Sequence, residues 1–447
     1  MAYLSRVVDL RPRAGARGTQ QHPDSQLALF GWRSWFDKGA WAIADRGLFS
    51  LSNFAINIVL ARWLSPHDYG AFALAHAIFL LLGAVYTSFL TDPMLVFGAG
   101  RYRQRLPGYF SVLLRVHWVV AGAASLILLA AALGIMLTGQ NTLATVMAAL
   151  ALASPFILFQ WLLRLACYVK LEPHRAAYAG ALYMTFIAAG MYALHDMDKL
   201  SPATSIALMG IASIASVAEL IPTFKRRPSR VPEPQLLHDV VADHWGYCRW
   251  IAGSNALAWT PHGLCYLLLP AWGGLGAAAA LRALINLIMP VLHTYWALAG
   301  VLVPVLVRAR EHAAFGRIVR FVLSLWIVGA LAYWMLLGWF HRPVMHWLYN
   351  GRYDEHASLL WLVAFLPVLF AKELILNSVL RAHDRPDQIF WASVLTSLTA
   401  STVGVALIFM WGLTGAALAL LCASITNVAV MAWQCRTRIV PAASVND

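Results

Sequence analysis

Polar and charged side chains recur along several long apolar segments at spacings that place them on one face of a helix. In residues 41–64, Arg46, Asn53 and Asn57 follow one another at intervals of seven and four, which puts them on the same side of an α-helix. Asp45 directly precedes Arg46. Charged and amide groups are costly inside a membrane, so they normally face a partner helix or a water-filled cavity. This segment therefore offers a polar stripe that could contact a ligand.

A second stripe occurs in residues 276–305, where Arg282, Asn286 and His293 share one helical face. Arg282 has no acidic neighbour in the sequence. Two interpretations of Arg282 therefore stay open on equal terms: it lines a cavity, or it only holds helices together. The other candidates are His76 in residues 70–92, Asn255 and His262 in residues 247–270, and the adjacent Lys372 and Glu373 in residues 357–381.

Most of these residues also have a simpler structural interpretation. A single Asn or His in a membrane helix usually hydrogen-bonds a neighbouring helix. The neighbours Asp45 and Arg46 could form a local ion pair without any ligand, and so could Lys372 and Glu373. Arg46 is also close enough to the membrane surface for its guanidinium to reach the interface.

If the stripes face one another, they enclose a cavity with more positive than negative charge. Arg46, Arg282 and Lys372 would join the three histidines of the stripes, against Asp45 and Glu373. Such a cavity favours an anionic head group such as a phosphate or diphosphate, to which arginine offers paired donors. A transporter of organic cations would instead need unpaired acids. Asp45 and Glu373 are the candidates for coupling to an ion or a proton.

Motifs typical of enzymes and cofactor sites are missing from the sequence. It contains no nucleophile elbow, Walker loop, HExxH motif or zinc-ligand spacing, and the longest predicted external loop, residues 341–356, is too short for a catalytic domain. One cluster of metal-binding residue types occurs at His238, Asp239, Asp243 and His244. We expect that cluster to lie on a solvated cytoplasmic helix. The sequence therefore predicts no catalytic residue, no metal and no cofactor.

The segments that carry these residues are membrane spans. The 447 residues are 60% hydrophobic and only 12% charged, about half the charged fraction of a soluble domain. Apolar runs of about 20 residues can cross a bilayer, and they must be helical because unpaired backbone groups are not tolerated in lipid. The sequence predicts an all-α integral membrane protein with about twelve spans, near 41–64, 70–92, 109–137, 142–166, 176–194, 203–223, 247–270, 276–305, 317–340, 357–381, 387–410 and 412–434.

The distribution of basic residues predicts how the chain is oriented. Most of the 33 Lys and Arg residues lie in the two terminal tails and in loops on the same side as the tails, and such loops are normally cytoplasmic. This explains the net charge of +13 without nucleic acid as a partner. The predicted organisation is an N-terminal cytoplasmic tail (1–40), an N-lobe of spans 1–6 (41–223), a cytoplasmic linker (224–246), a C-lobe of spans 7–12 (247–434) and a C-terminal cytoplasmic tail (435–447).

Two stretches indicate that the lobes are duplicated. Residues 60–82 and 266–288 both read as a helix end, a turn near a glycine and a helix rich in small residues. When Gly70 is aligned with Gly276, His76 aligns with Arg282. The sequence therefore predicts two pseudo-symmetric lobes of six helices.

Residues 53–98 (NFAINIVLARWLSPHDYGAFALAHAIFLLLGAVYTSFLTDPMLVFG) are similar to the opening of bacterial polysaccharide-biosynthesis exporters. Residues 347–385 (WLYNGRYDEHASLLWLVAFLPVLFAKELILNSVLRAHDR) are similar to their second-lobe pattern, although Asn-Gly-Arg stands where a Gly-acid-Lys run is expected. Together the two stretches resemble Wzx-type flippases of the multidrug/oligosaccharidyl-lipid/polysaccharide (MOP) exporter superfamily.

The resemblance implies a MATE-like fold in a bacterial inner membrane, with a central cavity and alternating access. It implies that Arg46, Arg282 and Lys372 engage the diphosphate of a polyprenyl-linked oligosaccharide within the membrane lipid, and that glycan polymerases or glycosyltransferases are partners. The predicted function is therefore a flippase for a lipid-linked oligosaccharide or related anionic glycan precursor. The alternatives are a drug or organic-cation exporter of the same fold, and a membrane glycan polymerase or ligase.

Overall fold

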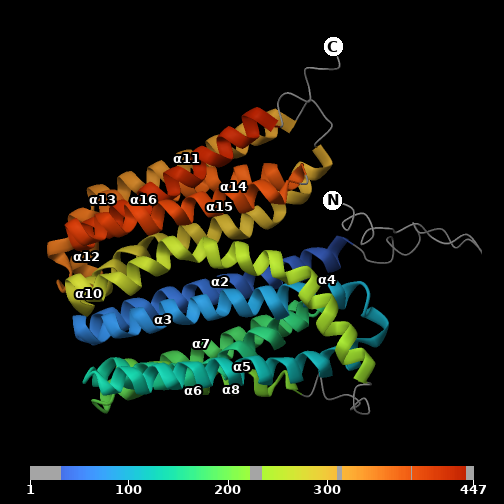
Figure 1. The fold of residues 1–447 in the computed structure, drawn as a ribbon, viewed down its shortest axis with the longest axis horizontal. Helices are drawn as coiled ribbons and strands as arrows, with labels where there is room; N and C mark the ends of the chain where they lie inside the picture. Colours follow the sequence, from blue (N-terminus) through green and yellow to red (C-terminus); the bar gives the residue numbers. More distant parts are fainter. Residues whose placement is uncertain (1–31, 222–233, 310–314, 384, 439–447) are drawn as a thin grey trace, which may run out of the picture. The chain divides into compact units, whose positions relative to one another are not determined.

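The computed structural model describes residues 32–221, 234–309, 315–383 and 385–438, and all of their regular structure is helical (Figure 1). Met1–Ala40 form one unit, in which α2 begins at Trp32, and Trp41–Asp447 form the other.

The described part of the predicted N-lobe contains six helical segments that match the six predicted spans. Its elements are α2 (Trp32–Trp63), α3 (Pro66–Tyr86), the π-helical η2 (Thr87–Thr91), α4 (Asp92–Ala99), η3 (Arg103–Arg105), α5 (Leu106–Leu137), α6 (Asn141–Val169), α7 (Pro173–Asp196) and α8 (Pro202–Ala218). The second span consists of α3, η2 and α4 in direct succession.

The predicted C-lobe has the same number of segments, although some are joined end to end. Its elements are α10 (Pro234–Ala309), α11 (Phe315–Trp339), α12 (His341–Tyr349), η4 (Asp354–Leu359), α13 (Leu360–Val363), α14 (Leu366–Ala382), α15 (Pro386–Thr399), the π-helical η5 (Ala400–Gly404) and α16 (Val405–Arg438).

Helix starts and breaks follow from local sequence. Ser65 caps α3, its side chain accepting a hydrogen bond from the backbone N–H of Asp68 at 3.1 Å. Two glycines divide helices that otherwise run on: Gly274 has φ 69° and ψ 174° within α10, and Gly412 has φ 52° within α16. Positive φ is a conformation that glycine adopts without steric cost. Each break separates two of the predicted spans.

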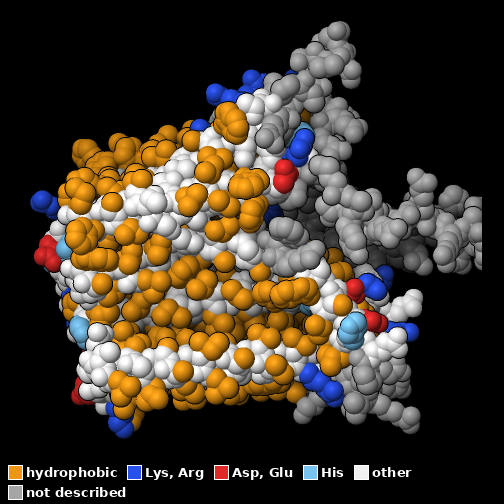
Figure 2. Space-filling view, viewed as in Figure 1, with side chains coloured by type: hydrophobic (Ala, Val, Ile, Leu, Met, Phe, Trp, Pro, Cys, Tyr) orange, Lys and Arg blue, Asp and Glu red, His pale blue; other side chains and the backbone are white. Residues whose placement is uncertain are grey.

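The chain is a multi-pass membrane protein. Among the described residues, eight helical stretches are long and apolar enough to cross a bilayer. Two of these stretches contain the glycine breaks and are long enough for two spans each. With the shorter apolar α8 and the 32-residue α2, the described helices match the twelve predicted spans. Figure 2 shows hydrophobic side chains along the length of the helices, with charged side chains gathered towards the helix ends.

The two lobes meet closely where α3 packs against α10, in blue and yellow-green in Figure 1. A Cβ atom added to Gly70 would lie only 1.9 Å from the carbonyl oxygen of Leu275, so the two backbones touch. Alanines close to these residues in the chain are fully buried on both helices, among them those at positions 71 and 278. Small residues of this kind allow membrane helices to approach each other. The contact lies at the helix ends that we predict to be external.

Three details differ from the sequence-based expectation. The helix of the seventh span begins at Pro234, so part of the predicted linker 224–246 is helical, and residues 224–233 lie outside the described part. The positive φ falls at Gly274, whereas Gly276 is helical. The predicted loop 341–356 contains α12, which buries Tyr349 against the outer part of α10.

Candidate functional site

The polar stripes of α2 and α10 face each other. Arg282 on α10 donates from Nε to Oδ1 of Asn57 at 2.9 Å and from Nη2 to Nδ1 of His76 at 3.2 Å. Arginine can only donate, so the Nδ1 atom of His76 accepts and carries no proton. The guanidinium is therefore held by two neutral acceptors from α2 and α3, across the contact between the lobes.

The same pairing continues along both helices towards the predicted cytoplasmic side. Asn286 donates to the carbonyl of Phe54 at 3.3 Å, and Nδ1 of His293 lies 2.7 Å from Oγ of Ser50. The residue numbers rise on α10 as they fall on α2, because the two helices are antiparallel. The spacing of the stripes in the sequence thus anticipated which helical faces meet.

Arg282 is almost completely buried, with 7% of its surface exposed, and Asn57 and Asn286 are buried beside it. Tyr69 donates from its hydroxyl to Oδ1 of Asn57 at 3.3 Å, and the hydroxyl of Tyr349 donates to the carbonyl of Ala283 at 2.9 Å. The groups around the guanidinium are neutral hydroxyl, amide and imidazole groups. None of the ion pairs within the described part of the chain involves Arg282.

The remaining predicted site residues lie in several places. Asn53 accepts from the side-chain amide of Asn57, and Asn255 donates to Oγ of Ser88 at 2.7 Å across the lobes. His262 and Lys372 are exposed, and Glu373 is half-buried on α14. Arg46 lies on α2, but its side chain is outside the described part. The structure thus brings Arg282, Asn57, His76, Asn286 and His293 into one polar row and leaves His262 and Lys372 outside the hydrogen bonds that form it.

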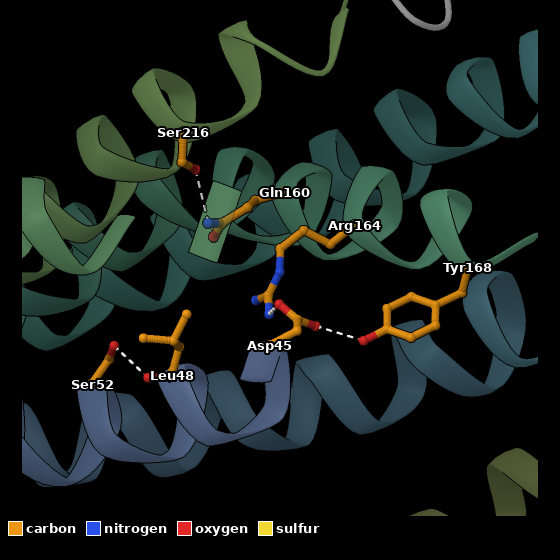
Figure 3. A network of polar contacts seen from close by, with 7 residues as sticks. All are labelled: Asp45, Leu48, Ser52, Gln160, Arg164, Tyr168 and Ser216. Carbon is orange, nitrogen blue, oxygen red and sulfur yellow. Dashed lines mark hydrogen bonds and ion pairs between the residues drawn. The ribbon is translucent and has the colours of Figure 1, made fainter. Parts of the chain in front are cut away.

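Asp45 has a partner that sequence reasoning missed (Figure 3). Its carboxylate accepts from Nη2 of Arg164 at 2.5 Å and from the hydroxyl of Tyr168 at 2.8 Å. Both partners lie on α6, more than a hundred residues away in the sequence. One turn before Arg164, Gln160 bonds Ser216 and Ser213 of α8. Asp45 is thus neutralised inside the N-lobe, and no signal in the sequence distinguished Arg164 from other arginines near helix ends.

The expectation of a solvated cluster at residues 238–244 was wrong for two of its four members. His238 and Asp239 are exposed, but Asp243 and His244 pack against the N-lobe. The signal that could have revealed this is the i, i+4 series Leu236, Val240, His244 and Cys248, an amphipathic stripe. Within the described residues, no group of three or more His, Cys, Asp or Glu side chains is arranged to hold a metal.

Comparison with known proteins identifies the fold but no close relative. No protein-family model matches the chain, and no curated protein sequence matches it. An inward-facing multidrug resistance MATE family transporter of the MOP superfamily is 13% identical, with a TM-score of 0.75, and covers 91% of this chain and 100% of its own. The lipid II flippase MurJ in an inward closed conformation is 12% identical, with a TM-score of 0.69, over 89% of this chain and 87% of its own.

A third similar structure is a MOP superfamily transporter from Pyrococcus furiosus, described as having a binding pocket of reverse polarity that suggests a different function. It is 12% identical, with a TM-score of 0.63, over 92% of this chain and 96% of its own. These likenesses confirm the predicted fold class. The chain therefore has the MATE-like fold of MOP superfamily transporters, an all-α membrane fold of about twelve spans in two pseudo-symmetric lobes of six.

Proposed function

We propose that the protein is an alternating-access flippase that moves a lipid-linked oligosaccharide or a related anionic glycan precursor across the bacterial inner membrane. One observation carries the proposal: the guanidinium of Arg282 is buried between the lobes, without a carboxylate partner among the described residues. A buried charge without a counter-charge is expensive. A phosphate or diphosphate arriving between the lobes would supply that counter-charge through paired hydrogen bonds.

The geometry also supports a mechanism in which the two lobes separate to give the cargo access to the site around Arg282. Arg282 is bonded to α2 and α3 of the opposite lobe. When the outer ends of the lobes part, these bonds must break, and the guanidinium then needs a new acceptor. An anionic head group bound to Arg282 would supply it, so that cargo binding and lobe separation favour each other. The fold shared with the flippase MurJ supports cargo of this lipid-linked kind.

The alternative of a drug or organic-cation exporter is supported by the likeness to multidrug MATE transporters. A cation exporter requires an acidic side chain that is free to bind the cation. Whether Asp45 and Glu373 form ion pairs within the protein is therefore informative. Asp45 is already paired with Arg164, whereas Glu373 forms no ion pair among the described residues. Glu373 is therefore our preferred residue for ion or proton coupling. The row around Arg282 favours an anion.

The experiment is a binding measurement on the purified protein in lipid nanodiscs. A polyprenyl diphosphate is compared with the uncharged polyprenol and with an organic dye cation. Hydrogen bonds to charged groups contribute about 1.5–3 kcal/mol, so Arg282→Gln should weaken diphosphate binding by roughly 10- to 100-fold. Arg282→Lys, which keeps the charge but loses the paired donors, should lose less. Arg320→Gln, at an exposed arginine on α11, is the matched control and should bind as the wild type does.

Each alternative gives a different result in these measurements. Binding of the cation in preference to the diphosphate, insensitive to Arg282→Gln, would replace the glycan assignment with drug export. A deletion strain that accumulates unpolymerised lipid-linked units on the outer leaflet would favour a polymerase or ligase, because export would then be intact. Accumulation of these units on the cytoplasmic leaflet supports the flippase.

A further inference from the structure

The first part of α10 is docked on the N-lobe, although the sequence predicts most of it to be part of the linker that precedes the C-lobe. Residues 234–248, which we name the α10 arm, form a helical extension before the glycine break of α10. On the arm, Val240, His244 and Cys248 are buried and share one helical face. The N-lobe covers this face: a Cβ atom on Gly108 at the start of α5 would lie 3.1 Å from the Leu236 side chain.

Two adjacent polar residues anchor the arm. Asp243 accepts from Nη1 of Arg101 at 2.6 Å and from the hydroxyl of Tyr102 at 2.6 Å. Charge-assisted hydrogen bonds of this kind are stronger than those between neutral groups. The exposed fraction of the Asp243 side chain is 19%, against 52% for Asp239 on the same arm, so only one of these two carboxylates is used in docking.

His244 makes two further bonds to the same lobe. Its Nδ1 lies 2.9 Å from the carbonyl of Phe89 in η2, and its Nε2 lies 2.8 Å from the hydroxyl of Tyr109 in α5. A carbonyl can only accept, so Nδ1 carries the proton, and in the neutral imidazole Nε2 accepts from the tyrosine. Both ring nitrogens are therefore fully used, and the ring is fixed in orientation.

Aromatic contacts surround these bonds. Trp245 stacks on Phe89 with ring centroids 5.7 Å apart, and Tyr247 lies edge-on to Phe97 at 5.6 Å. Every partner named for the arm belongs to η2, α4 or the start of α5, or to the short connection between α4 and α5. By contrast, among the described side chains, the first hydrogen bond from the membrane part of α10 to a C-lobe helix is at Leu257, whose carbonyl accepts from Ser397 at 2.7 Å.

We infer that the α10 arm is mechanically part of the N-lobe: it stays docked while the lobes rock, and α10 bends between Cys248 and Leu257. The boundary between the moving bodies then lies inside a helix, several residues after the predicted lobe boundary at residue 247. The arm keeps the cytoplasmic end of the seventh span on the N-lobe in both states. This inference rests on the proposed alternating access, but it is independent of the cargo.

The test places a larger side chain, here called the wedge, at the external contact between the lobes. Because Gly70 leaves no room for a Cβ atom beside Leu275, Gly70→Val should force the outer ends of the lobes apart and favour the outward-open state. Distances between pairs of spin labels are measured in a background in which the five cysteines are replaced. The label pairs are His67 with Arg352 across the outer ends, Val241 with Arg175 between arm and N-lobe, and Val241 with Arg320 between arm and C-lobe, all at exposed or half-exposed positions.

With the wedge, we expect the outer distance to lengthen and the arm-to-C-lobe distance to shorten, while the arm-to-N-lobe distance stays unchanged. An arm-to-N-lobe distance that lengthens together with the outer distance would overturn the inference and leave alternating access intact. An outer distance that does not respond to the wedge would overturn alternating access, and the role of the arm with it.

A second set of variants tests whether the named contacts hold the arm. Asp243→Ala combined with Tyr109→Phe should broaden the arm-to-N-lobe distance distribution, in both the wedged and the unwedged protein. Asp239→Ala, on the exposed side of the same arm, is the matched control and should leave the distribution narrow. Equal distributions for the two sets would show that these bonds do not dock the arm.

Discussion

At the scale of single residues, the pair of Asp45 and Arg164 gives the sharpest stability prediction. Both side chains are buried, and removing one member of a buried ion pair leaves an uncompensated charge. Arg164→Gln should therefore lower the free energy of unfolding by about 3 kcal/mol or more. Adding Asp45→Asn should recover part of this loss, because the stranded carboxylate disappears. Thermal unfolding in detergent measures both variants.

The control for that comparison is the half-exposed pair of Arg175 and Glu172 on the same lobe. An exposed pair contributes about 0–1 kcal/mol, so Arg175→Gln should barely change the unfolding temperature. If Arg164→Gln and Arg175→Gln proved equally mild, the buried pair would not stabilise the N-lobe.

A pH dependence follows from His244. Burial lowers the pKa of this imidazole, outweighing the opposing effects of the Phe89 carbonyl and Asp243. The undocked histidine takes up a proton near pH 6.5, while the docked one stays neutral. The docked state therefore binds fewer protons, and docking weakens as the pH falls below about 6.5. After correction for the intrinsic chemical rate, hydrogen exchange of residues 234–248 should accelerate as the pH falls from 7.5 to 5.5.

Replacing His244 with glutamine should remove this dependence, whereas His238→Gln should keep it, since His238 is exposed. Exchange rates in the arm that follow only the intrinsic chemical pH dependence would contradict the assignment.

At the scale of elements, the break in α10 depends on one glycine. Gly274 has φ 69° and ψ 174°, a region that is essentially restricted to glycine, where other residues are strained by about 1–3 kcal/mol. Gly274→Ala should lower the unfolding temperature. Gly276→Ala, in helical conformation with open space around its Cβ position, should be neutral or slightly stabilising. Equal unfolding temperatures for the two variants would show that the break tolerates a side chain.

The elements also show how far the sequence could predict this molecule. The spans and the facing stripes of α2 and α10 were predictable, because apolar length and the helical repeat are local properties. The arm was misjudged because its partners, Arg101 and Tyr102, lie far away in the chain. The partner of Asp45 was hidden for the same reason. Contacts between distant segments depend on how the helices pack, which spacing alone does not encode.

At the scale of the whole molecule, the predicted orientation can be tested directly. The basic loops predict that both termini are cytoplasmic. Single cysteines at His67 and Arg352, both exposed, should react with a membrane-impermeant maleimide added to spheroplasts. A cysteine at Arg320 should react only after the membrane is opened. The reverse labelling pattern would invert the topology and the direction of transport.

The contact between His76 and Arg282 has a consequence for how the two lobes can differ. These residues align when the repeats are superposed through Gly70 and Gly276, and in the structure they hydrogen-bond each other. In a chain with identical halves, each residue here would meet its own copy, as in a two-fold homodimer. Two arginines would repel one another, and two histidines would offer no permanent cation. A permanent positive charge can lie beside a hydrogen-bond acceptor at the pseudo-symmetry axis only when the sequences of the two halves have diverged.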